Sequence, residues 1–304
     1  MPPSACKPPH RPIPPGATAA RVATMRPLRQ RSDRAAVDIP AAPPQLLVSV
    51  ACASEARAAL AGGADWIDLK EPARGALGSV DVDTAQAVAT LLPAQERLSA
   101  AAGELAEWPT GRGRESLRVP RIELVKLGLA GFAAASHDKA ARTELAERAA
   151  AAVAAARAAG KQVVLAGYAD AARADAPAPE VVRDLCCQLR LPWLLIDTFD
   201  KRGGGLLDWL PPRALARLLA SCRRAGLHTA VAGRLRCADF AALPAGLVDV
   251  VGVRSAACGG DRTGAVSETA VRNLKETLHA AAAAANCPEV ARQQVDATRA
   301  PASS

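Results

Sequence analysis

The chain has 304 residues, of which 50% are hydrophobic and 3% aromatic, so its core must be built mainly from Ala, Val and Leu. This length suits one α/β barrel with extra tails and exceeds that of most single β-sandwiches. The formal net charge of +8 is uneven, because residues 1–44 hold seven basic and two acidic side chains. A nucleic-acid interpretation would rest on this tail alone, so we expect a solvated basic tail and no nucleic-acid partner.

Cysteine spacing and hydropathy exclude several classes of protein. The eight cysteines include no C-x-x-C pair and no zinc or iron–sulfur spacing, so we expect no metal and reduced thiols. No apolar run is long enough to span a membrane, and the N-terminus lacks the hydrophobic stretch of a signal peptide. The sequence therefore predicts a cytoplasmic protein with no membrane partner.

Both ends of the chain have the composition of tails. Residues 1–44 are rich in Pro, Ala and Arg, and residues 288–304 are similar, so neither segment can bury much apolar surface. We expect both tails to be disordered and residues 45–287 to form the catalytic domain. Met25 offers an alternative start, which would shorten the first tail.

Between the tails, short apolar runs alternate with Ala-rich helical patterns. The runs are residues 46–50, 66–70, 97–100, 122–126, 163–167, 193–197, 229–233 and 248–253. Near-continuous hydrophobicity is typical of parallel strands covered on both faces. Helices are expected at residues 54–61, 84–92, 138–159, 180–189, 212–225 and 267–284, and a loop with room for one short helix at 104–121. The order predicts a single eight-stranded (β/α)8 barrel.

Scarce lysines stand at the carboxyl ends of these strands. The chain has 31 Arg but seven Lys, and only a lysine amine can lose its proton and attack a carbonyl. Reactive residues of a parallel barrel come from this rim. The second, fourth and sixth strands bring Asp68, Lys70, Lys126, Asp197 and Lys201 to it.

Asp68 and Lys70 are two residues apart, so they share one face of their strand. If that face points into the barrel, desolvation and neighbouring cations lower the pKa of the lysine and free its amine. The aspartates oppose this shift but can shuttle protons. The alternative is a set of structural ion pairs that close the barrel mouth. Three lysines with two aspartates favour catalysis.

The last two strand ends have the character of a phosphate site. Gly233 and Gly252 allow backbone N–H groups to approach an anion, and the Arg254 guanidinium can bind one through two hydrogen bonds. We also expect Tyr168 and Asp170, at the end of the fifth strand, to contact the substrate. The following Gly-rich turn is not a Walker loop, so nucleotide binding is not expected.

Several of these segments together resemble the (5-formylfuran-3-yl)methyl phosphate synthase family, also called 4-(hydroxymethyl)-2-furancarboxaldehyde-phosphate synthase. The resemblance covers residues 46 to about 276, and the segments that carry it are residues 47–49, 61–72, 75–78, 125–129, 166–170, 196–198, 250–254 and 256–258. The sequence departs from the family pattern at residues 99–104.

The resemblance implies a TIM barrel that condenses two molecules of glyceraldehyde 3-phosphate for methanofuran-type cofactor biosynthesis. It implies that Lys70 forms the Schiff base and Lys126 accepts a proton, with Asp68, Asp197 and Lys201 assisting. We expect a phosphate-eliminating carbon–oxygen lyase that needs no cofactor and has a triose phosphate as its partner. A class I aldolase for another phosphorylated aldehyde and a non-catalytic phosphosugar-binding barrel remain alternatives. Oligomeric state is left open.

Overall fold

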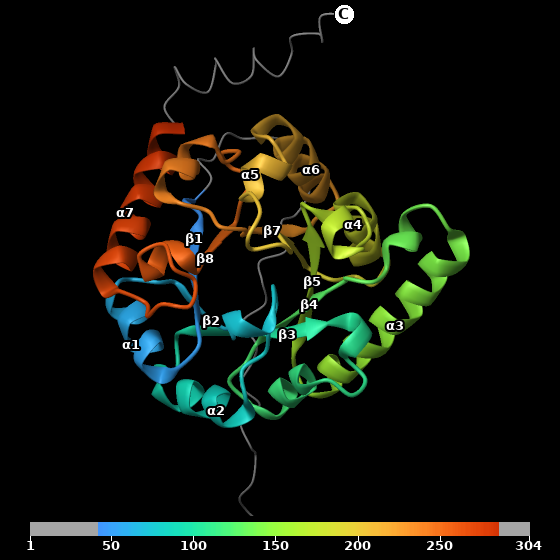
Figure 1. Ribbon diagram of the computed structural model, residues 1–304, viewed down its shortest axis with the longest axis horizontal. Helices are drawn as coiled ribbons and strands as arrows, with labels where there is room; N and C mark the ends of the chain where they lie inside the picture. Colours follow the sequence, from blue (N-terminus) through green and yellow to red (C-terminus); the bar gives the residue numbers. More distant parts are fainter. Residues whose placement is uncertain (1–41, 286–304) are drawn as a thin grey trace, which may run out of the picture. The chain divides into compact units, whose positions relative to one another are not determined.

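Within residues 42–285, which the computed structural model describes, eight parallel strands close into a barrel in sequence order (Figure 1). The strands are β1 Gln45–Val50, β2 Trp66–Leu69, β3 Arg97–Glu104, β4 Leu124–Gly128, β5 Gln162–Tyr168, β6 Trp193–Asp197, β7 His228–Val231 and β8 Val250–Val253. β1 pairs with both β2 and β8, and this pairing closes the ring. The predicted barrel is confirmed.

Helices form a ring outside the strands (Figure 1). They are α1 Ala53–Ala61, α2 Val82–Leu91, α3 Lys139–Ala158, α4 Pro179–Gln188, α6 Pro212–Arg224 and α7 Glu268–Ala285, with the short α5 Leu206–Trp209 after β6. Each of the six predicted helices is confirmed to within two residues at both ends. Local chemistry explains the boundaries. α4 and α6 begin with proline, and the Asp138 carboxylate caps α3 by accepting from Ala140 N at 2.6 Å.

Short 3-10 turns make the remaining connections. They are η1 Pro72–Arg74, η2 Leu105–Glu107, η3 Arg112–Arg118, η4 Ala133–Ser136, η5 Ala171–Ala174, η6 Cys237–Ala242 and η7 Ser255–Cys258. Between β3 and β4, η2 and η3 stand where an α-helix would complete the repeat. This agrees with the predicted loop at residues 104–121, whose prolines and glycines interrupt any amphipathic pattern.

The amino-terminal end of the barrel interior is filled by aromatic rings. Trp66 and Trp193 meet edge to face with ring centroids 5.9 Å apart, and Trp193 stacks on His228 at 4.7 Å. Both tryptophans are buried. Farther along β6, the inward side chains change from Trp193 through Leu195 to Asp197, so polarity collects at the opposite, carboxyl end.

β3 extends four residues beyond the predicted strand and reaches Glu104. Its pairing with β4 is irregular between Ala101 and Glu104, where Gly103 has a positive φ of 81°. A glycine adopts this conformation without steric cost. Gly103 N also donates to Leu77 O at 2.8 Å, which fixes the end of the strand beside the loop after β2.

The seam between β8 and β1 is held by a buried ion pair. The Glu55 carboxylate on α1 binds the Arg254 guanidinium at the end of β8 through two contacts, of 2.5 Å and 3.0 Å. Their side chains are 9% and 8% exposed. The same carboxylate accepts from Ala51 N at 2.7 Å, so it also orders the turn between β1 and α1.

None of the helices within residues 42–285 combines the length and the apolar character needed to cross a membrane. The predicted tails lie outside the described residues, apart from positions 42–44. Their proposed disorder and the domain limits at 45 and 287 stay predictions.

We predict that Glu55→Gln lowers the free energy of unfolding by about 3–5 kcal/mol, because the buried Arg254 cation loses its counter-charge. Urea denaturation followed by circular dichroism measures the change. The matched control is Glu268→Gln, which removes a carboxylate from the exposed pair with Arg272 and should cost less than about 1 kcal/mol. Equal losses in the two variants would contradict the role given to the seam.

Candidate active site

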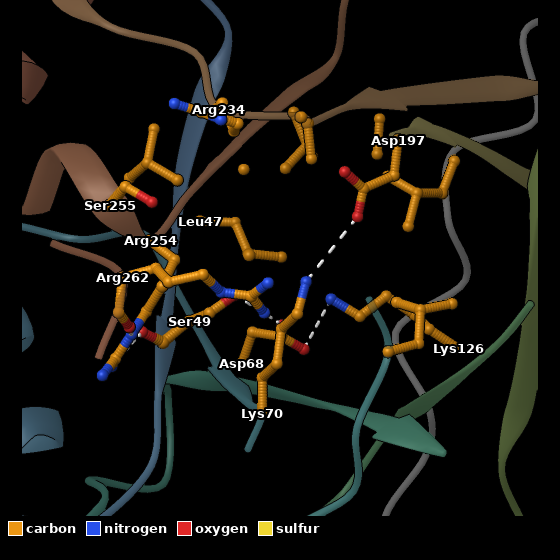
Figure 2. Close-up of a pocket in the computed structure, with 18 of the residues that line it drawn as sticks. Leu47, Ser49, Asp68, Lys70, Lys126, Asp197, Arg234, Arg254, Ser255 and Arg262 are labelled. Carbon is orange, nitrogen blue, oxygen red and sulfur yellow. Dashed lines mark hydrogen bonds and ion pairs between the residues drawn. The ribbon is translucent and has the colours of Figure 1, made fainter. Parts of the chain in front are cut away.

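An open cavity lies at the carboxyl end of the barrel. Small-molecule sites of barrel proteins occur at this end. Figure 2 shows charged side chains converging on it from several strands. The charged residues that line it are Asp68, Lys70, Lys126, Asp197, Lys201, Arg234, Arg254 and Arg262. The fold therefore brings the three predicted lysines and both predicted aspartates into one cavity.

Asp68 is the buried anion of one half of the cavity. Its Oδ1 lies 2.5 Å from Lys126 Nζ and accepts a hydrogen bond from Ser99 Oγ at 2.7 Å. Its Oδ2 accepts from Ser49 Oγ at 2.9 Å. Asp68 thus pairs with the lysine of β4 and not with Lys70, its neighbour along the chain (Figure 2). The two serines hold the carboxylate in a fixed orientation.

Asp197 is the buried anion of the other half. Its Oδ1 accepts from Lys201 Nζ and from Thr198 N, each at 2.7 Å. Its Oδ2 lies 3.6 Å from Lys70 Nζ. Lys201 Nζ also donates to the carbonyl and hydroxyl oxygens of Thr198. Asp197 therefore stands between two lysines that come from different strand ends.

Burial and charge change the protonation of these groups. Desolvation lowers the pKa of Lys126, although the adjacent Asp68 carboxylate opposes the shift. Desolvation also lowers the pKa of Lys201 to about 8, against the attraction of Asp197. Burial acts to raise the pKa of Asp197, but the Lys201 and Lys70 ammonium groups outweigh it and hold that pKa at about 2. The cavity thus combines an ionised carboxylate with amines that lose protons readily.

Lys70 is held less tightly than the other two lysines. Its Nζ is 3.6 Å from Asp197, beyond hydrogen-bond distance, whereas the Nζ atoms of Lys126 and Lys201 lie 2.5 Å and 2.7 Å from their carboxylates. Its side chain is 9% exposed and faces the cavity (Figure 2). An amine in this position can reach a ligand without first breaking a short ion pair.

Arg254 differs from the sequence expectation. It lines the cavity, but its five N–H groups already have protein acceptors. Besides the two contacts with Glu55, Nη1 donates to Ser49 O at 3.1 Å, Nη2 to Gly264 O at 3.0 Å and Nε to Arg262 O at 2.9 Å. The guanidinium therefore has no donor left for a phosphate in this arrangement. It fixes the loop that carries Arg262.

Two cavity cations, Arg234 and Arg262, were missed by the sequence reasoning. Arg234 is exposed, and its Nη1 donates to Lys201 O and Gly203 O, each at 2.7 Å. Arg262 is partly buried, and its Nη2 donates to Gly75 O at 3.1 Å, which links the loops after β8 and β2. A signal for Arg262 was present, because it stands in the Gly-rich turn after the last strand.

Both predicted glycines line the cavity, for different reasons. Gly233 has a φ of 110°, and a Cβ there would meet Thr198 Cγ2 at 2.9 Å. Gly252 lies in β8, where a Cβ would meet Ala232 Cβ at 3.3 Å and narrow the cavity. Arg234, next to Gly233, also has a positive φ, of 56°, which is uncommon for a side-chain residue.

Neither Tyr168 nor Asp170 lines the cavity, so the substrate contacts expected of them stay predictions. Tyr168 is fully buried and donates from its hydroxyl to Glu104 Oε1 at 2.6 Å. Burial, followed by the Glu104 charge, raises the pKa of Tyr168 well above its usual value. Asp170 accepts from Phe199 N at 2.7 Å and from Asp200 N at 2.8 Å, and so ties the loop after β6 to that after β5.

Comparisons with known proteins point to one family. A family model described as 4-HFC-P synthase matches residues 46–275. The (5-formylfuran-3-yl)methyl phosphate synthase of Methanopyrus kandleri is 33% identical over 241 residues, which cover 77% of this chain and 99% of that protein. The enzyme of the same name from Methanothermobacter thermautotrophicus is 34% identical over 240 residues, covering 77% and 98%. The solved structure of KGPDC from Streptococcus mutans has a TM-score of 0.51 at 12% identity, and the match covers 78% of this chain and 98% of that chain. This similarity shows the fold alone.

We predict that the rate at which a small amine-reactive reagent acylates Lys201 rises with pH, with a midpoint near pH 8. Only the neutral amine reacts, and the pKa of Lys201 is about 8. In Asp197→Asn the midpoint should fall further, because the carboxylate that favours the ammonium form is lost. Competitive labelling followed by peptide mass spectrometry measures both midpoints, with circular dichroism as the control for folding. A higher midpoint in a folded Asp197→Asn variant would contradict the assigned electrostatics.

Proposed function

The chain belongs to the 4-HFC-P synthase family, and we propose that it condenses two molecules of glyceraldehyde 3-phosphate into (5-formylfuran-3-yl)methyl phosphate through an imine at Lys70. The observation that carries the proposal is the position of Lys70, whose Nζ faces an ionised Asp197 at 3.6 Å inside a cavity rich in cations. The product would serve the biosynthesis of a methanofuran-type cofactor.

The first step is attack of the neutral Lys70 amine on the aldehyde carbon of one triose phosphate. A C–N bond forms, and water leaves from the resulting carbinolamine to give the imine. The ionised Asp197, whose pKa is about 2, is suited to stabilise the positive charge that develops on the nitrogen, and Lys201, whose pKa is about 8, is suited to exchange the protons of these steps. Lys201, hydrogen-bonded to the other oxygen of Asp197, keeps that carboxylate in place.

The second stage needs a base for a C–H proton next to the imine carbon. Lys126 is suited to this work, because burial lowers its pKa and Asp68 fixes the position of its amine. The enamine then expels the phosphate at C3 of the bound triose, and that C3 forms the new C–C bond with the carbonyl carbon of the second triose, which has isomerised to the ketone form. Ring closure with loss of two molecules of water, followed by hydrolysis of the imine, gives the furan and frees Lys70. No oxidant or reductant is required, because the overall change is an elimination.

The charge of the cavity supports a phosphorylated substrate. Arg262 and Arg234 enter the cavity from the loops after β8 and β7, beside the backbones of Gly233 and Gly252. Both guanidinium groups keep donors beyond those used in their contacts with backbone carbonyls. We assign the substrate phosphate to this side of the mouth, with Arg254 acting through the loop that it holds.

Incubation with glyceraldehyde 3-phosphate and borohydride should give one reduced adduct, and peptide mass spectrometry should map it to Lys70. The variant Lys70→Met should form no adduct at this position and no furan product. Lys139→Met, which removes an exposed lysine at the start of α3, is the matched control and should behave as the unaltered protein. An adduct at another residue, or full activity in Lys70→Met, would contradict the proposal. An adduct without a furan chromophore would point to an aldolase.

Lys126→Met should separate imine formation from proton transfer. We expect the borohydride adduct at Lys70 to persist, while furan formation falls by about 10²–10⁴-fold, the usual contribution of a positioned base. Asp68 keeps its hydrogen bonds from Ser49 and Ser99, so the site should retain its shape. Ultraviolet absorbance of the furan aldehyde follows the reaction. Equal losses of adduct and product would assign Lys126 to the imine step instead.

A further inference from the structure

The cavity is confined to one side of the barrel mouth. Among the described residues, its lining comes from β1, β2, β4, β6, β7 and β8 and from the loops after β2, β6, β7 and β8, and β3 and β5 contribute nothing to it. Lys126 on β4 and Asp197 on β6 stand at its edge on that side (Figure 2). Something other than the lysines and aspartates therefore fills the mouth above β3, β4 and β5.

This space is occupied by two hydrogen-bonded side chains, Glu104 and Tyr168, which meet over the inner face of β4. Glu104, at the end of β3, accepts from the Tyr168 hydroxyl at the end of β5 at 2.6 Å. A Cβ at Gly128, between them on β4, would collide with Glu104 Oε2 and with the Tyr168 hydroxyl oxygen. The two side chains thus meet over a residue that leaves room for them. We call Glu104, Gly128 and Tyr168 the β3–β5 wall.

The wall is held on both sides. Glu104 Oε2 accepts from Ala130 N at 3.0 Å, so both carboxyl oxygens have donors. The Tyr168 ring packs edge to face on Phe199, with centroids 5.3 Å apart. Burial raises the pKa of Glu104 against these hydrogen bonds. A side chain with this many fixed partners does not move aside for a ligand without losing them.

The wall also borders the groups that handle substrate. Gly128 is two residues beyond Lys126, on the same face of β4 and about 6–7 Å farther along the strand. Tyr168 pairs with Asp197 in the register of β5 and β6. With the phosphate held on the β7–β8 side by Arg262 and Arg234, a chain on Lys70 that is longer by one carbon needs more room beside Lys126 and Asp197, where Glu104 and Tyr168 close the mouth.

We propose that Glu104 is a specificity-determining residue, which with Tyr168 closes the β3–β5 side of the mouth and limits the aldehyde phosphate to three carbons. This inference rests on the imine chemistry of the proposed function and adds the rule by which that site selects its substrate. A longer aldehyde phosphate must displace the wall and break its hydrogen bonds. Discrimination of one methylene by a packed pocket is about 10–200-fold.

The test compares imine trapping at Lys70 with glyceraldehyde 3-phosphate and with erythrose 4-phosphate, which has one carbon more. Mass spectrometry gives the second-order rate constant of adduct trapping for each substrate. The quantity compared is the rate constant for the four-carbon substrate divided by that for the three-carbon substrate. We expect Glu104→Ala to raise this ratio by about tenfold or more. Glu104→Gln, which keeps the volume of the side chain, should change the ratio by less than about threefold.

The matched control is Glu107→Ala, which removes an exposed glutamate three residues farther along and should leave the ratio unchanged. Glu104→Asp, shorter by one methylene, serves if the alanine variant does not fold, and the ratio should rise in it as well. An unchanged ratio in every folded variant shortened at Glu104 overturns the inference while leaving the imine intact. Failure of the unaltered protein to form an adduct with glyceraldehyde 3-phosphate would instead overturn the proposed function.

Discussion

The mouth of the barrel depends on keeping two buried carboxylates and three lysine amines together without an uncompensated charge. Asp68 and Asp197 meet this constraint separately, since each takes one short contact with a lysine and further hydrogen bonds from serine or backbone donors. Removing either anion would leave a buried cation. Lys70, which shares Asp197 with Lys201, is the amine that this arrangement leaves free to react.

The sequence predicted the barrel and the reactive residues at the carboxyl ends of its strands, because both arise from local patterns. Apolar runs with intervening helical periods are read directly, and lysines are rare enough that Lys70, Lys126 and Lys201 stand out at strand ends. The partners were less accessible. Asp68 and Lys70 are neighbours in sequence, yet the carboxylate binds Lys126, because which inward side chains meet across a barrel depends on the stagger of its strands.

The arginines show the opposite difficulty. Arg254 has the position and chemistry of a phosphate ligand, and only its contacts with Glu55 and three backbone carbonyls show that its donors are already used. Arg262 sits in an irregular loop among many other arginines, where no periodicity marks it. Glu104 was hidden by the length of β3, since the irregular pairing that carries it over β4 has no counterpart in a hydrophobic pattern.

The aromatic floor formed by Trp66 and Trp193 has a consequence for the path of substrate and product. With the amino-terminal end packed, the carboxyl mouth is the route by which molecules enter and leave the cavity within residues 42–285. Under the proposed reaction, both trioses therefore enter through this mouth, and the phosphate and the furan leave through it as well.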